Sequence, residues 1–465
     1  MEKRVYFNSD NPTDNKIFNA AERKLLNNIK IFDGRRVLIE GSTYSNLWLE
    51  TQPMGGEMYA KRDLEIAYNN HILFMENIRK DGRFPGMISQ GKSGLTCDYE
   101  WLQGCFFAIS AYKIYYLCDL QSDYLKLLYE CLKSFDEYLW KYRDSDGDGC
   151  LETWCIWDTG EDNSSRLKGF PDKFGGEIAP TAFLPFESMD FMGFSYANRD
   201  ILSKISRILE NGEDKVWREK ANAVKRKIRN YLWDDSKKAC FDRDGYNKRI
   251  PVLIHNNLRV MYFNAFSQSM ANDFVKVHLL NEKEFWTPMP LPSIAANEAI
   301  FQNEPYNNWS GQPEGLTYQR AIRALENYGF FGVVVALGEK LLSAIGDECV
   351  FTQQFDPFTA KPSLPPKDGL DGYSPTMLAA LEYISRMYGI HIDEDMVWWS
   401  AIGNETEFEY AQQYKGHCYK IIAGKSVFRC YDSDKFLFEF AKGRRVITNL
   451  NGEIIKVIDN LRKGV

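Results

Sequence analysis

The chain has 465 residues, of which 44% are hydrophobic and 26% are charged, a composition typical of globular proteins. The net charge of −7 argues against nucleic acids and anionic membranes as partners, because both are bound through clustered lysine and arginine. No apolar stretch approaches the roughly 18 residues of a membrane span, and the N-terminus lacks the apolar segment of a secretory signal. The ten cysteines show no zinc-ligand spacing and, without a signal, are typical of reduced thiols. We therefore expect a cytoplasmic protein.

Helical patterns separated by loops rich in glycine, proline, aspartate and asparagine occupy most of the chain. The spacing of apolar residues predicts helices over residues 62–79, 101–118, 124–142, 189–210, 213–232, 256–271, 314–327, 330–345 and 373–388. Strand-like alternation is almost absent there. Many helices joined by polar loops favour paired helices wound into a toroid, with the loops at one end forming the site.

The pattern changes near residue 395. Short alternating segments separated by glycine, aspartate and asparagine predict strands over residues 407–411, 418–422, 426–431, 435–440 and 445–449. The expected fold is therefore mainly α, with an (α/α)6 toroid in residues 1–394 and a small antiparallel β appendage in residues 395–465.

One polar segment, Trp157–Arg166, combines three carboxylates, a tryptophan, a glycine, two hydroxyls and an arginine. Unpaired carboxylates are costly to bury, so core packing does not explain this mixture, whereas a site that cleaves sugars needs such groups. Asp162 is the candidate general acid, and Trp157 would supply an apolar wall that raises the pKa of its carboxyl. The alternative is that Asp162 only caps a short helix.

An acidic loop precedes this segment. Asp144, Asp146, Asp148 and Glu152 resemble the alternating acids of a calcium loop. The glutamate that ends such a loop is missing, because Cys155 stands in its place. The missing glutamate favours a tight acidic turn between helices over a calcium site, and we expect no other cofactor.

A second polar and aromatic loop, Tyr306–Glu314, precedes a predicted helix. Trp309 is a candidate platform for a sugar ring, or alternatively a core residue. Glu314 either caps the helix or contributes a carboxylate to the site.

Several motifs together resemble a known group of enzymes. The segments Asp81–Ile88, Asp158–Arg166, Tyr231–Asp235 and Asn308–Gly311 resemble, in order and spacing, motifs of the (α/α)6 inverting glycosidases. The resemblance is greatest to glycoside hydrolase family 63, in its mannosylglycerate hydrolase-like branch, and extends to trehalases. It covers residues 55–390, with departures at Ser310 and Gln312.

This resemblance implies inverting, exo-acting hydrolysis of a small α-linked disaccharide or glycoside by an α-glucosidase- or α-mannosidase-like enzyme. Asp162 falls on the family's catalytic acid. The residues that would bind sugar hydroxyls or stack on the ring are Arg62, Asp63, Trp157, Arg166, Trp309 and Gln312.

The position of the family's general base departs from the pattern. The family has a glutamate there, whereas this chain has Gln353, whose amide has no oxygen basic enough to accept a proton from water. Two explanations stay open: an inactivating Glu→Gln exchange at this position, or another carboxylate, such as Glu314, acting as the base. A non-catalytic carbohydrate-binding protein and a glycoside phosphorylase are the rival functions, and the sequence does not indicate an oligomeric state.

Overall fold

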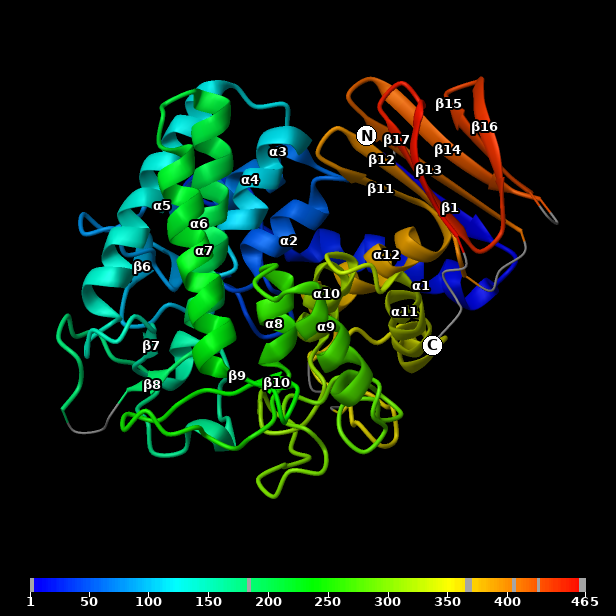
Figure 1. The fold of residues 1–465 in the computed structure, drawn as a ribbon. Coiled ribbons are helices and arrows are strands. Elements are labelled where there is room, and N and C mark those ends of the chain that lie inside the picture. The colour runs from blue at the N-terminus through cyan, green and yellow to red at the C-terminus, as the bar shows by residue number, and fades with distance from the viewer. Residues whose placement is uncertain (1–3, 182–184, 364–369, 404–406, 425–426, 460–465) are drawn as a thin grey trace.

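The computed structural model describes residues 4–181, 185–363, 370–403, 407–424 and 427–459. Within these residues, twelve α-helices occupy most of the chain and antiparallel strands follow toward the C-terminus (Figure 1). No described helix is long and apolar enough to cross a membrane. The prediction of a mainly helical chain with a C-terminal antiparallel β part is confirmed.

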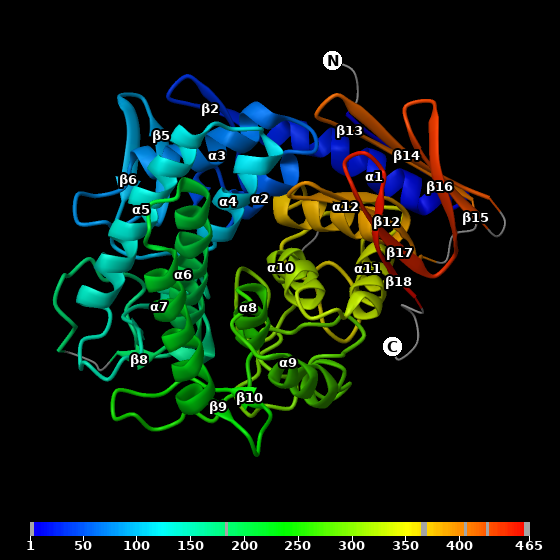
Figure 2. The same cartoon turned by 45° about the horizontal axis from the view of Figure 1, so that its top comes forward.

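The even-numbered helices form a closed ring. Each contacts the next one, and the last returns to the first (Figure 2). They are α2 (Gln52–Tyr59), α4 (Ala108–Leu117), α6 (Met189–Leu209), α8 (Asn256–Tyr262), α10 (Gly315–Glu326) and α12 (Ser374–Tyr388). The odd-numbered helices are α1 (Pro12–Leu25), α3 (Leu64–Glu76), α5 (Ser122–Tyr142), α7 (Asp214–Lys227), α9 (Gln268–Phe274) and α11 (Phe331–Ile345). All of them except α9 pack against members of the ring.

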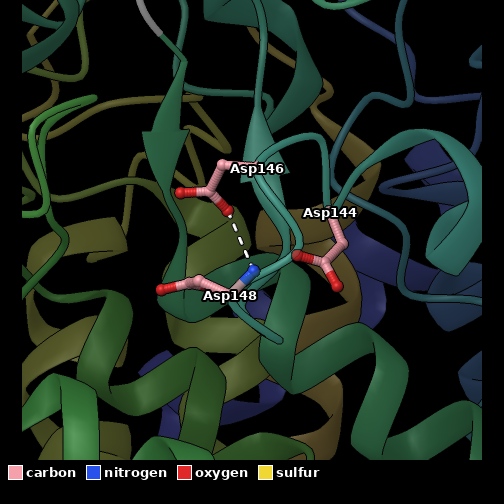
Figure 3. A group of neighbouring side chains, drawn as sticks. All are labelled: Asp144, Asp146 and Asp148. Carbon is pink, nitrogen blue, oxygen red and sulfur yellow. Dashed lines mark hydrogen bonds between the residues drawn. The ribbon is translucent and has the colours of Figure 1, made fainter.

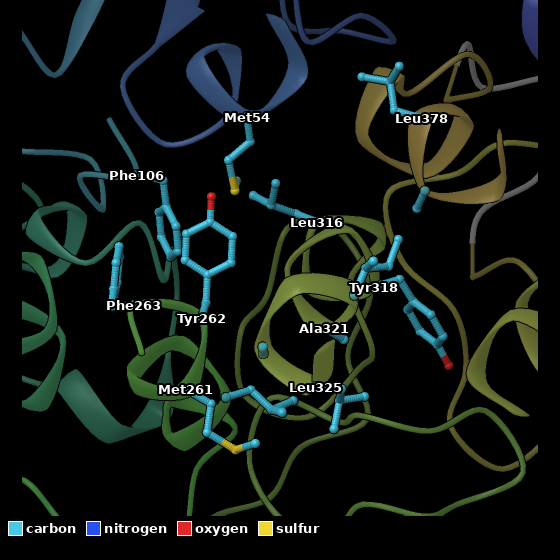
Figure 4. Close-up of a cluster of buried hydrophobic side chains, with 14 of the residues drawn as sticks. Met54, Phe106, Met261, Tyr262, Phe263, Leu316, Tyr318, Ala321, Leu325 and Leu378 are labelled. Carbon is cyan, nitrogen blue, oxygen red and sulfur yellow. The ribbon is translucent and has the colours of Figure 1, made fainter. Parts of the chain in front are cut away.

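Burial separates the ring from the helices that surround it. All 15 residues of α12 are buried, whereas α7 buries three of its 14 residues. An inner helix must be apolar or internally paired on every side, while an outer helix needs only one apolar stripe. Met54, Tyr262, Leu316 and Leu378, from four helices of the ring, contribute to one buried cluster (Figure 4).

Two predicted helices differ from the observed ones. The helix predicted over 101–118 begins only at Ala108, because Gln103 and Gly104 have positive φ angles of 45° and 53° that an α-helix cannot hold. The helix predicted over 256–271 is two helices, α8 and α9, separated at Asn264, whose φ is 60°. Helices α1 and α2 were not predicted, and α2 contains two glycines, which weaken a helical pattern.

The β part consists of two antiparallel sheets. The five-stranded sheet has the order β1–β13–β14–β15–β16 and the four-stranded sheet the order β11–β12–β17–β18. Their strands are β1 (Val5–Ser9), β11 (Ile390–Asp393), β12 (Met396–Ala401), β13 (Phe408–Tyr414), β14 (His417–Ala423), β15 (Val427–Asp432), β16 (Lys435–Ala441), β17 (Arg444–Asn449) and β18 (Ile454–Ile458). The N-terminal strand β1 pairs with β13, so the β part also includes residues from the start of the chain. The proposed boundary between 394 and 395 stays a prediction.

Short strands also occur between the helices, which the near absence of alternation in that part did not predict. They form β2–β3, β4–β5–β6, β7–β8 and β9–β10. Their bounds are β2 (Ile29–Phe32), β3 (Arg35–Leu38), β4 (Leu47–Trp48), β5 (Met87–Gly91), β6 (Gly94–Asp98), β7 (Glu152–Thr153), β8 (Phe186–Glu187), β9 (Trp233–Asp234) and β10 (Ala239–Cys240). Several have only two residues, too few to show a period.

Candidate active site

A pocket of about 60 Å³ lies at the end of the ring where the inner helices begin. Glu50, Leu316 and Tyr373 reach it from the N-terminal ends of α2, α10 and α12. Its polar wall consists of Glu40, Glu50, Gln103, Asp162, Asn307 and Gln353, and its aromatic wall of Tyr44, Trp48, Trp157, Trp309 and Tyr373. Acids, amides and flat aromatic faces are the groups that hold sugar hydroxyls and sugar rings.

The loop that carries Asp162 is held by its neighbour Asp158. This carboxylate is fully buried, forms an ion pair with Arg143 (2.5 Å), and accepts backbone hydrogen bonds from Leu102 (3.1 Å) and Trp154 (2.9 Å). Asp158 is therefore structural. Gly160, two residues later, has a φ of +71°, and a Cβ there would lie 2.5 Å from the Glu50 carboxylate, so only glycine fits.

Asp162 is half-buried on the pocket wall, with Oδ1 of its carboxyl sealed from solvent. Its Oδ2 accepts a hydrogen bond from Asn307 Nδ2 (2.7 Å), and its Oδ1 has no partner among the described residues. Burial raises the pKa of Asp162 to about 7, against the opposing hydrogen bond from Asn307, and the negative charge of Glu50 adds to the rise. A carboxyl group with this pKa is partly protonated at neutral pH, as a general acid requires.

Gln353 also lines the pocket, and Asn307 joins it to Asp162. Asn307 Oδ1 accepts hydrogen bonds from Gln353 Nε2 (2.8 Å) and Trp309 Nε1 (3.1 Å). Gln353 Oε1 accepts a hydrogen bond from Tyr44 Oη (3.0 Å). Both ends of the Gln353 amide are therefore engaged, and the side chain of Asn307 spans the space between the two predicted catalytic positions.

Two further acids on the wall were not predicted. Glu40 Oε1 accepts a hydrogen bond from Tyr373 Oη (2.6 Å), while Glu50 forms an ion pair with Arg320. Burial raises the pKa of Glu40 to about 8, although the Tyr373 hydroxyl opposes the rise. Both acids precede the motifs on which the family resemblance rests. The spacing of Tyr44, Trp48 and Glu50 was the one signal in the sequence that could have found this part of the site.

Glu314 is the residue before the first turn of α10 and does not belong to the pocket wall. Both of its carboxylate oxygens are sealed from solvent and have no hydrogen-bond partner in the described part of the chain. Burial raises the pKa of Glu314 well above its usual range, and the negative charges of Glu50, Asp162 and Glu40 add to the rise.

The structure brings together only two of the six predicted sugar-binding residues, Trp157 and Trp309. The other four lie away from the wall and have partners of their own. Arg62 pairs with Glu22 (2.6 Å), Asp63 caps α3 and pairs with Arg36 (2.9 Å), Arg166 pairs with Glu161 and Asp242, and Gln312 donates to Asn303 (2.8 Å). These arginines and Asp63 have the contacts of structural residues, and spacing along the chain could not reveal those distant partners.

A match to a known protein family covers most of the residues that line the pocket. A family model described as the mannosylglycerate hydrolase MGH1-like glycoside hydrolase domain matches residues 49–374. The chain belongs to this family. The match includes Asp162, Asn307, Gln353 and Tyr373 but begins after Glu40. The resemblance inferred from the sequence motifs is thus confirmed, and the chain is a glycoside hydrolase by family.

Solved structures show the same fold. An uncharacterized conserved protein from Thermus thermophilus is 16% identical with a TM-score of 0.66, covering 78% of this chain and 99% of that chain. The GH63 mannosylglycerate hydrolase from Thermus thermophilus, in complex with glucose, is 16% identical with a TM-score of 0.63, covering 79% and 99%. A neutral trehalase from Saccharomyces cerevisiae is 12% identical with a TM-score of 0.58, covering 79% and 80%. A search of curated protein sequences finds no match.

The acidic loop of this glycoside hydrolase lies outside the pocket. Asp144, Asp146 and Asp148 offer carboxylate oxygens within 4.8 Å of one another, and Asp146 Oδ1 accepts a hydrogen bond from the backbone of Asp148 (3.1 Å; Figure 3). A second group with the same spacing is Asp146, Glu152 and Glu187. Glu187 was not predicted, because it comes from β8, far along the chain.

Proposed function

We propose that the chain is an inverting, exo-acting α-glycosidase that hydrolyses a small α-linked disaccharide or glycoside, with Asp162 as its general acid. The observation that carries the proposal is the buried Asp162 carboxyl, with a pKa of about 7, on the wall of an aromatic-lined pocket. The closed ring of six helices supports an (α/α)6 toroid as the scaffold.

Asn307 has a defined part in this reaction. Its amide covers Asp162 Oδ2, so the glycosidic oxygen must displace this amide before Asp162 can protonate it. Trp157 and Trp309 would then face the sugar ring. The proton passes from Asp162 to the leaving oxygen as water attacks the anomeric carbon from the opposite side.

The names of the relatives suggest the first substrates. Mannosylglycerate and trehalose, with other α-mannosides and α-glucosides, would be incubated with the chain as it stands, and the anomer released would be followed by NMR. Release of the β-anomer first is the expected result. Sugar binding without hydrolysis would favour an inactivated site or a carbohydrate-binding protein, and turnover that requires phosphate would favour a phosphorylase.

We also propose that the acidic loop binds calcium, with Glu187 as a ligand that the sequence did not indicate. Glu187 is 3% exposed, and its Oε2 has no partner among the described residues. Its oxygen lies within 4.8 Å of those of Asp146 and Glu152, a spacing that suits oxygen ligands about 2.4 Å from a central ion. Lys227 occupies one side of Asp148 (3.2 Å), which favours the group that contains Glu187 over the three aspartates.

Thermal unfolding in EDTA and in calcium chloride tests this site. Calcium at a hundred times its Kd is expected to stabilise the fold by about 2.7 kcal/mol. The gain should vanish in Glu187→Gln but persist in Glu177→Gln, a matched change at an exposed glutamate. If calcium does not change the unfolding temperature of the unaltered chain, the proposal is contradicted.

A further inference from the structure

An inverting glycosidase needs a second carboxylate that takes a proton from the attacking water. The amide of Gln353 cannot do this, and its two ends are already engaged by Tyr44 and Asn307. The described wall of the pocket holds three carboxylates, those of Glu40, Glu50 and Asp162. With Asp162 as the acid, Glu40 and Glu50 remain.

Glu50 is neutralised by a counter-ion. Its Oε1 forms an ion pair with Arg320, whose side chain is 1% exposed, and its Oε2 accepts a long hydrogen bond from Gln103 Nε2 (3.4 Å). Burial raises the pKa of Glu50 in spite of Arg320, but both of its oxygens are engaged, so neither is free to hold the attacking water. Glu314 fails for another reason, since both of its oxygens are sealed from the pocket.

We propose that Glu40 is the general base of this site, in place of the residue at 353. The inference rests on the proposed function, because it assigns a second catalytic group to the same reaction. Tyr373 Oη holds Oε1 of Glu40 (2.6 Å), while Oε2 has no hydrogen-bond partner in the described part of the chain and is available to a water molecule. Only the ionised form of Glu40 can act as the base, and because its pKa is raised to about 8 this form is a minor one at pH 7 but a stronger base than an ordinary carboxylate.

Tyr44 connects Glu40 with the position that the family uses for its base. The ring of Tyr44 packs edge-on against that of Tyr373 (6.3 Å between centroids), and its hydroxyl donates to Gln353 Oε1 (3.0 Å). Tyr373, Tyr44 and Gln353 thus form a chain of contacts from Glu40 to residue 353. Glu40 is thus linked to the Gln353 position through two tyrosines, and Asp162 is linked to it through Asn307.

The step balances as a hydrolysis. Oε2 of Glu40 takes one proton from water, and the water oxygen bonds to the anomeric carbon. The bond from that carbon to the leaving oxygen breaks, and the oxygen receives the proton of Asp162. Solvent then removes the proton from Glu40 and returns one to Asp162.

Glycosyl fluorides separate the base from the acid, because fluoride leaves without a proton. The probes are α-mannosyl fluoride and α-glucosyl fluoride, tested with the unaltered chain, Glu40→Gln, Glu314→Gln and Asp162→Asn. Glu40→Gln is expected to lower kcat on the fluoride at least 100-fold, within the range for loss of a general base. Asp162→Asn is expected to keep fluoride hydrolysis while losing hydrolysis of ordinary glycosides.

Sodium azide supplies a readout that a structural role would not produce. Azide needs no base, so it should restore turnover of the fluoride by Glu40→Gln and yield the β-glycosyl azide. If Glu40→Gln folds poorly, Glu40→Asp replaces it, and it should keep part of the activity without azide.

Fluoride hydrolysis within three-fold of the unaltered chain in Glu40→Gln, or a 100-fold loss with azide rescue in Glu314→Gln alone, overturns the assignment of Glu40 and leaves the proposed function intact. Failure of the unaltered chain to hydrolyse any fluoride or glycoside overturns both.

Discussion

Both ends of the helical ring hold buried carboxylates, yet the pKa values of these acids shift in opposite directions. At the end that carries the pocket, Asp162 and Glu40 have no cationic partner, and burial raises their pKa values to about 7 and about 8. At the other end, under the β part, lies a cavity of about 190 Å³. There, burial alone would raise the pKa of Glu382, but the charges of Lys61 and Arg386 outweigh it and lower the pKa to about 2.

This difference shows that burial alone does not decide the direction in which the pKa of a carboxyl group shifts. Without a counter-ion, burial raises the pKa of a carboxyl toward neutral pH, where the group can either donate or accept a proton, whereas with a counter-ion the charged form serves as a structural partner. The larger cavity is therefore not the better candidate for catalysis. Its charged residues are paired with one another, as Lys61 with Glu382 (2.8 Å) and Arg323 with Glu57.

The largest expected effect is at the pocket end. Asp162→Asn removes the proton donor and should lower kcat on a glycoside about 10²- to 10⁴-fold, with little change in the unfolding temperature, because its Oδ1 has no partner to lose among the described residues. Steady-state kinetics and circular dichroism measure both. A variant with full activity would show that the acid lies elsewhere.

At the opposite end, a change of the same chemical kind should affect stability. Glu382→Gln leaves the buried Lys61 without a counter-charge and Arg386 with Glu326 alone, and is expected to cost about 3–5 kcal/mol in free energy of unfolding. Denaturation in urea measures this cost. The matched control is Asp347→Asn, since the pair of Asp347 with Lys16 is exposed and should contribute less than about 1 kcal/mol. If Glu382→Gln and Asp347→Asn lower the free energy of unfolding equally, the buried ion pair is no more important for stability than the exposed one.

The pH dependence should show a smaller, ten-fold effect per pH unit. Asp162 donates only when protonated and Glu40 accepts a proton only when ionised, so kcat/KM for a glycoside is expected to rise with pH to about 7 and to fall above about 8. Asn307→Ala removes a hydrogen bond that favours the charged form of Asp162, so the pH of maximal activity should move upward. A glycosyl fluoride, which needs no acid, should lack the fall, and a fall with that substrate would assign the titration to another group.

Part of this architecture could be predicted because it is encoded locally. The helices from residue 124 to 232 follow from apolar spacing, and their observed bounds differ from the predicted ones by a few residues. Asp162 and Trp157 were found because their segment concentrates polar groups that no core would require. Arg62 and Asp63 were assigned to the site only through the family resemblance, and the structure gives them partners in α1 and β3 instead.

The sequence by itself determined the helical class, the glycosidase family and the identity of one acid, because a helical period, a motif and a turn each lie within a few consecutive residues. Only the tertiary structure decided which carboxylates share the pocket. Glu40, Asp162, Asn307 and Gln353 are separated by up to hundreds of residues, and no local pattern records that ring closure places them on one wall. Their protonation states were decided in the same way, since a buried carboxyl responds to cations that the fold supplies or withholds.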